Sequence, residues 1–145
     1  MPFVFSLAAL LSVRRRREEA EERHLAQLSA DLATARQTLH RIETELRRLA
    51  DEHAAAAPRT VQATHLHERY ARLSLLEQGR SEVSTHVHDL TERFAAQQQA
   101  YLRARCDREL LEELETTQRA TYAAGLLRQE TKRNDDAFLN RYLRN

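Results

Sequence analysis

The sequence predicts an all-α protein in which two long helices form an antiparallel coiled-coil hairpin with a C-terminal helical overhang. Three observations predict this fold class: a composition of strong helix formers, a heptad repeat in the first half, and a second apolar repeat after a proline. The 145 residues include only two glycines and two prolines, and 31% of them are charged. Few helix breakers together with many charged residues are typical of long helices and coiled coils.

The first helix is expected over residues 6–54, because its apolar residues follow a heptad spacing. Steps of three and four residues alternate over more than three heptads, which is the pattern of a coiled coil. Ser6 is the expected N-cap, with Phe5 and Leu10 forming a hydrophobic staple around it. The repeat consists of Leu25, Leu28, Leu32, Ala35, Leu39, Ile42, Leu46 and Leu49.

A turn is expected at residues 55–60, because Pro58 cannot lie inside a continuing helix without a kink. Thr60 is a suitable N-cap for a second helix over residues 61–143. The whole chain, residues 1–145, is therefore expected to form a single coiled-coil hairpin.

The apolar repeat of the second helix mirrors the first one in reverse order. When the two are aligned about the turn, Ile42 faces Leu73 and Leu28 faces Val87, so an antiparallel pair would bury both repeats. The same alignment places Ala35 opposite Arg80. The second repeat consists of Leu66, Tyr70, Leu73, Leu76, Val83, Val87, Leu90 and Phe94.

Farther from the turn, the repeat of the first helix becomes polar, and this part of the pair is expected to be held less tightly. Charged residues of the first helix would face aromatic and amide residues of the second: Glu21, Glu18 and Arg14 against Phe94, Gln97 and Tyr101. The first helix ends opposite residue 111, which leaves residues 112–145 without a partner in the chain. An isolated helix gains most of its stability by burying an apolar face, so this overhang is expected to order against another protein.

The two ends of the chain and the turn resemble the FliJ family of bacterial flagellar export proteins, together with its relatives in virulence type III secretion. The opening FVFSLAALLSVRRRREEAEE is similar to the family's F-x-F-x-L-x-x-L-L-x-x-R start, and RQETKRNDDAFLNRY is similar to its basic and acidic ending. The matching residues are Phe3, Phe5, Leu7, Leu10 and Leu11 at the start and Lys132, Arg133, Asp135 and Asp136 at the end.

The resemblance implies a non-enzymatic protein without cofactors, shaped like the stalk of a rotary ATPase. It implies that the end bearing the termini docks in the hexameric export ATPase, FliI. Nearer the turn, such a stalk contacts the export gate protein FlhA and escort chaperones. The location implied is the cytoplasm, at the cytoplasmic face of the export apparatus on the inner membrane.

Candidate docking residues follow from the resemblance and from their chemistry as apolar anchors with cationic surroundings. For the ATPase they are Phe3, Phe5, Arg14, Arg15, Arg16, Arg17, Lys132, Arg133 and Phe138. For the export gate they are Tyr70, Leu73, Leu75 and Leu76. One leucine of the last three must point outward, which is common on helices and does not by itself indicate a site.

Other chemistries are disfavoured by the spacing of the residues. The arginine run lies beside Glu18 and Glu19, which cancel the accumulated charge that phosphate binding needs. Histidines two residues apart, in HLH and HVH, face different sides of a helix, and the single Cys106 has no catalytic signature around it. The opening apolar stretch is too short to span a bilayer and has its basic residues on the wrong side for a secretory signal.

The chain is expected to be a monomer when alone, with no nucleic-acid partner, no bound metal and no membrane insertion. Two alternatives stay open at this point. A generic coiled-coil scaffold or self-assembling structural protein would form stable dimers or larger bundles. A small helical nucleic-acid-binding protein would bind DNA or RNA in a salt-sensitive way.

Overall fold

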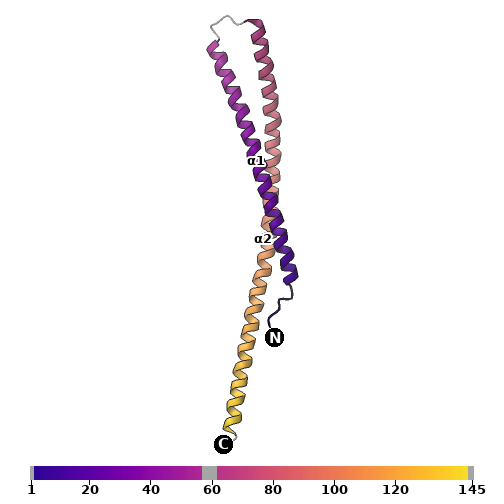
Figure 1. The fold of residues 1–145 in the computed structure, drawn as a ribbon, viewed down its shortest axis with the longest axis vertical. Helices are drawn as coiled ribbons and strands as arrows, with labels where there is room; N and C mark the ends of the chain where they lie inside the picture. The colour runs from indigo at the N-terminus through magenta and orange to yellow at the C-terminus, as the bar shows by residue number, and fades with distance from the viewer. Residues whose placement is uncertain (1, 57–61, 144–145) are drawn as a thin grey trace. The chain divides into compact units, whose positions relative to one another are not determined.

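The computed structural model describes residues 2–56 and 62–143, and these residues form two long helices and no strand. Helix α1 spans Ala8–Ala56 and helix α2 spans Ala63–Tyr142. The two helices pack against each other in antiparallel directions (Figure 1). The predicted all-α hairpin is confirmed.

The start of α1 differs from the expectation. The amide of Ala8 donates to the carbonyl of Phe5 at 3.2 Å in a turn, and the amide of Leu11 donates to the carbonyl of Leu7 at 2.9 Å. Because the helix begins at Ala8, the prediction of Ser6 as the N-cap is wrong. Leu11 is buried, whereas Leu10 is exposed and no longer stands four residues after the cap, so the predicted staple between Phe5 and Leu10 is wrong as well.

The end of α1 lies at Ala56 and the start of α2 at Ala63. The predicted turn over 55–60 and the Thr60 cap fall largely on residues 57–61, which lie outside the described part of the chain. The described helices thus reach two residues beyond the expected end at 54 and begin two residues after the expected start at 61.

Each helix contributes a segment to both of two compact units. We call Glu21–Ala100 the central unit, and Met1–Ala20 together with Tyr101–Asn145 the terminal unit. The candidate ATPase-docking residues, near both ends of the chain, belong to the terminal unit. The candidate export-gate residues belong to the central unit.

A buried apolar cluster holds the central unit together. It comprises Leu28, Leu32, Ala35 and Leu90, with Val87 and Phe94 packed against it. Burial of such side chains contributes about 1.5–3 kcal/mol each relative to exposure. Residues of the heptad repeat of α1 are therefore buried against α2, as their spacing predicts.

The contacts between the helices add detail to the predicted pairing of apolar residues. Leu28 and its predicted partner Val87 pack in the same apolar cluster. A Cβ at Gly79 would lie 3.8 Å from Ile42 Cδ1, so the side chain of Ile42 reaches α2 at Gly79. Gln97 donates a hydrogen bond to the backbone carbonyl of Glu21, a contact that the apolar pattern did not predict.

In the terminal unit, α2 has a partner well beyond residue 111. Arg15 binds Glu112 at 2.9 Å, and the rings of Phe3 and Tyr122 are in contact. The prediction that residues 112–145 all lack a partner is therefore wrong. Every residue from 126 to 143 is exposed, and we call this segment the C-terminal arm.

Candidate docking surfaces

The two N-terminal phenylalanines are engaged within the terminal unit. The ring centroids of Phe3 and Tyr122 lie 5.6 Å apart with an interplanar angle of 50°. The guanidinium of Arg119 lies 5.5 Å from the centroid of the Phe3 ring, which is a cation–π distance. Phe5 is buried, with 6% of its surface exposed. Both anchors predicted for the ATPase are thus engaged inside this unit, and the contacts of Phe3 place the residues before the first turn beside α2.

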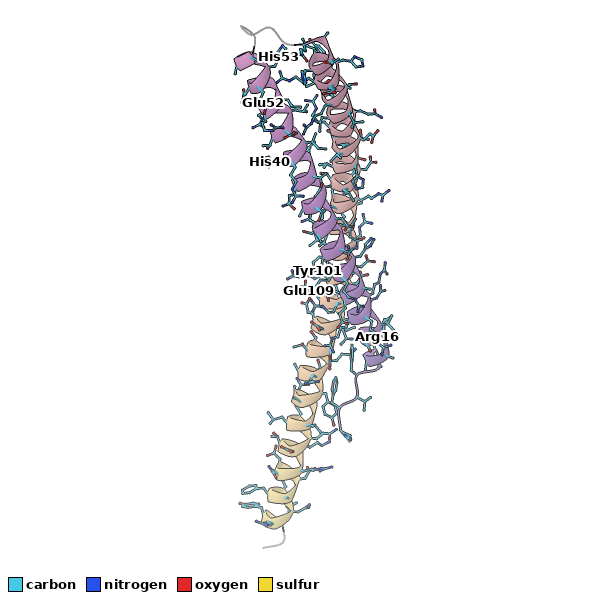
Figure 2. The ribbon with its side chains drawn as sticks, turned by 45° about the horizontal axis from the view of Figure 1, so that its top comes forward. Arg16, His40, Glu52, His53, Tyr101 and Glu109 are labelled. Atoms are coloured by element: carbon cyan, nitrogen blue, oxygen red, sulfur yellow. The ribbon has the colours of Figure 1, made fainter. Side chains whose placement is uncertain are left out.

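The four consecutive arginines divide into two pairs. Arg14 forms an ion pair with Asp107 at 2.9 Å, and Arg15 forms one with Glu112 at 2.9 Å. Arg16 and Arg17 are exposed (Arg16 is labelled in Figure 2), and no described residue forms an ion pair with either. This division follows from the helix itself, since consecutive residues point in different directions.

Arg108 extends the Arg15–Glu112 pair into a row of alternating charge. Its guanidinium donates to Glu18 on α1 and to Glu112, one turn along α2. The side chains of Arg108 and Glu18 are the least exposed of the ion-paired groups in this unit, at 21% and 15%. Glu112 therefore binds two guanidinium groups, one from each helix.

The electrostatics of Arg108 and Glu112 reflect this row. Hydrogen bonding to Glu18 is the main cause that raises the pKa of Arg108, although partial desolvation acts in the opposite sense. The hydrogen bond from Arg15 is the main cause that lowers the pKa of Glu112, and the charge of Arg108 adds to it. Both groups are therefore charged at neutral pH.

The C-terminal arm carries exposed apolar side chains on one side of its last turns. Phe138 and Tyr142 are one turn apart, as are Leu139 and Leu143, so the four share a face. Between 55% and 80% of each side chain is exposed. Lys132 and Arg133 lie one to two turns earlier and are exposed as well. Three of the predicted ATPase-docking residues, Lys132, Arg133 and Phe138, thus lie on an uncovered helix.

The candidate gate residues lie in the central unit and differ in exposure. Leu75 is 71% exposed and Tyr70 is 59% exposed, whereas Leu73 and Leu76 are half-buried. Leu75 is therefore the leucine that points outward, as the sequence required of one member of the group.

A shallow apolar groove of about 250 Å³ lies beside Tyr70 and Leu73. Its other lining residues come from the last turns of α1 and the first turns of α2: Leu49, Ala50, His53, Leu66 and Arg69 (His53 is labelled in Figure 2). The exposed ring of Tyr70 is part of its wall. This groove combines two candidate gate residues with apolar surface from both helices.

Several contacts that organise these surfaces were missed by the sequence reasoning. Arg119 and Tyr122 hold Phe3, and Arg108 connects Glu18 to Glu112. Their signal in the sequence was a spacing of three to four residues along α2, which is also found on any solvated helix. Only the structure reveals which of these groups contacts the first twenty residues of the chain.

The remaining features of the described residues are their histidines, Cys106 and the apolar stretches of the helices. No group of three or more metal-ligating side chains occurs among them. His65 and His88 lie near Glu68 and Glu92, each on the same helix face. Cys106 is exposed. Within the described ranges, neither helix has a stretch long and apolar enough to cross a membrane.

Comparison with known proteins gives the family of the chain. Neither the curated proteins nor the solved structures contain a match to it. The family model described as the flagellar FliJ protein, in contrast, matches residues 3–145, which is nearly the whole chain and includes both compact units. The chain therefore belongs to the FliJ family and is a component of flagellar protein export.

Proposed function

We propose that this protein is a rotary-stalk-like coiled coil that docks in the hexameric export ATPase. The observation that carries the proposal is the C-terminal arm, where Phe138, Leu139 and Tyr142 are exposed on a helix that nothing in the described chain covers. A row of exposed aromatic and aliphatic side chains next to free cations is typical of a protein-binding helix.

Exposed cations complement these apolar residues. Arg16 and Arg17 on α1 and Lys132 and Arg133 on α2 have no ion-pair partner among the described residues. Arg14 and Arg15, together with Phe3 and Phe5, contribute by fixing the N-terminal segment against α2. A hexameric ring that accepts this end would present acidic and apolar side chains along its central channel.

The central unit is the proposed contact region for the export gate protein and for escort chaperones. Tyr70 and Leu75 are exposed, and Leu73 and Leu76 lie beside them at partial burial. The groove next to Tyr70 adds apolar surface at the same end of the helices. In this role the chain works in the cytoplasm at the face of the export apparatus, without catalysing a reaction of its own.

Stimulation of the cognate export ATPase tests the docking. The purified chain is expected to raise ATP hydrolysis at substoichiometric amounts, and Phe138→Ala is expected to weaken its binding to the ATPase by tenfold or more, because truncating an exposed aromatic anchor costs about 1.4 kcal/mol or more. Leu110→Ala is the matched control, since Leu110 lies on the same helix and is similarly exposed.

Two results would contradict the proposal. One is a chain that neither binds nor stimulates the ATPase. The other is a stable homodimer whose partner binding is unchanged when residues 128–145 are removed, which would favour a structural scaffold.

A further inference from the structure

We propose that residues 2–20 form a detachable strap, a segment held on α2 by ion pairs and a few apolar contacts, which can leave α2 while the central unit stays folded. The proposal concerns the terminal unit alone and holds whichever partner the chain docks with. It differs from the docking role, which needs only that the terminal residues be presented.

Part of the contact between the strap and α2 is ionic. Three ion pairs connect it to α2: Arg14 with Asp107 at 2.9 Å, Arg15 with Glu112 at 2.9 Å, and Glu18 with Arg108. Two further contacts involve the extended residues, through the Phe3 ring with Tyr122 and Arg119. The more exposed pairs, Arg14 with Asp107 and Arg15 with Glu112, stabilise weakly and are screened by salt, whereas the less exposed pair of Glu18 and Arg108 is screened less.

Apolar burial is sparse in the same region. The buried apolar residues that the structure describes in the terminal unit are Phe5, Leu11 and Ala104. The central unit, in contrast, buries four apolar residues in one contiguous cluster with two more packed against it. Hydrophobic burial does not weaken with ionic strength as exposed ion pairs do, so salt should act on the strap and not on the cluster.

Detachment should be concerted because the charges are coupled. Glu112 binds both Arg15 and Arg108, and Arg108 in turn binds Glu18. Breaking one of these ion pairs therefore leaves the remaining charged side chains of the row with fewer partners and weakens the other pairs. Once off α2, residues 8–20 would be the end of a helix without tertiary support, and such an end frays.

Amide hydrogen exchange of the full chain at two salt concentrations tests the strap. Between about 0.05 M and about 1 M NaCl the screening length falls from more than 10 Å to about 3 Å. Amides of residues 8–20 are expected to exchange about tenfold faster at high salt, while those of residues 25–45 keep their rates. This factor corresponds to about 1.4 kcal/mol.

A pair of arginine variants isolates the cross-helix contact. Arg108→Ala is expected to give fast exchange of residues 8–20 already at low salt. Arg105→Ala is the control: Arg105 lies one turn away on the same helix and pairs with Glu109 of that helix at 2.8 Å, and none of the described residues of α1 forms an ion pair with it. Glu109 keeps its second ion pair, with Arg108, in this variant. Arg105→Ala is expected to leave the exchange of the strap as in the wild type.

A distance measurement separates detachment from fraying in place. Spin labels on Val4→Cys and Ala123→Cys, in a Cys106→Ser background, are expected to show one short distance at low salt and a broad, longer distribution at high salt. An unchanged distance at high salt, or persistent protection of residues 8–20, would overturn the proposal. Equal loss of protection in residues 25–45, in the wild type or in Arg108→Ala, would also overturn it, because the strap would then not be separable.

Discussion

Gly79 shows how a single residue influences the contact between the helices. It lies in the interior of α2, where glycine costs about 0.5–1 kcal/mol relative to alanine because of its backbone entropy. Its φ is negative, and the structure has room for a methyl group: a Cβ there would lie 3.8 Å from Ile42 Cδ1, an ordinary van der Waals distance. The glycine is thus not required by the packing.

Gly79→Ala is therefore expected to raise the free energy of unfolding by about 0.5–1 kcal/mol, through the unfolded state and the added contact with Ile42. Thermal unfolding followed by circular dichroism measures the change. Gly125→Ala serves as the comparison, since a Cβ at Gly125 has nothing within 4 Å and would gain helix propensity alone. A lower midpoint for Gly79→Ala would mean that the helices need the glycine for close approach.

Gln97 is the buried polar residue that fixes the pairing of its neighbourhood. Its amide nitrogen donates to the backbone carbonyl of Glu21 at 3.1 Å and to the carboxylate of the same residue. Leaving a buried amide without a hydrogen-bond partner would lower the stability of the fold by about 1–3 kcal/mol. Helix alignments that separate Gln97 from Glu21 are therefore disfavoured. A polar residue in a coiled-coil seam often selects the register in this way.

At the scale of the helices, α1 and α2 are held by different forces in the two units. The central unit relies on the apolar cluster around Leu28 and Leu90, and its surface adds ion pairs such as Arg72 with Glu45. The terminal unit buries Phe5, Leu11 and Ala104 and adds the charged row through Arg108 and Glu112. Solution conditions that change charge should therefore affect the terminal unit first.

Acid is expected to weaken the terminal unit through Glu112. The pKa of Glu112 is lowered below its ordinary value of 4.5 by the hydrogen bond from Arg15 and by Arg108. A carboxyl with a lowered pKa in the folded state stabilises the fold above its unfolded pKa, and this contribution is lost as the pH falls through the lowered value.

Glu112→Gln is accordingly expected to lower the unfolding midpoint at pH 7, and the difference from wild type should vanish as the pH falls well below 4.5. Unfolding curves at several pH values measure it. Glu113→Gln, next to it, is the control, because no described residue forms an ion pair with Glu113. A difference that persists at low pH would show that Glu112 acts through packing and not through its charge.

At the scale of the whole molecule, the two apolar repeats bury each other within one chain. The leucines of α1 that were predicted to pair with another helix are buried or half-buried against α2 of the same chain. The net charge is +1, so general electrostatic attraction to nucleic acid is weak. Six of the fourteen large apolar residues that are exposed in the described part of the chain lie on the C-terminal arm.

The chain is therefore expected to be a monomer at micromolar concentration, with a mass of 16.9 kDa by light scattering. The reason is that the heptad surface, which would otherwise drive dimerisation, is already buried intramolecularly. A mass of two chains or more would mean that the arms associate with each other through Phe138 and its neighbours. That outcome would support the self-assembling alternative.

The sequence by itself determined the helices, their antiparallel pairing and the family. Heptad spacing in α1, few helix breakers and the motifs at both ends are local properties, so they could be read without knowledge of contacts. The family match over residues 3–145 agrees with the resemblance carried by those motifs.

Only the tertiary structure decided which charged and aromatic residues meet. The apolar pattern indicates which faces of the helices pack together, but it does not place Glu18 beside Arg108 or the side chain of Ile42 at Gly79. The contact of Phe3 with Tyr122 was likewise not predictable, since it joins residues far apart in the chain. The physical reason is that hydrophobic burial is non-directional, whereas hydrogen bonds and ion pairs require particular partners at short range.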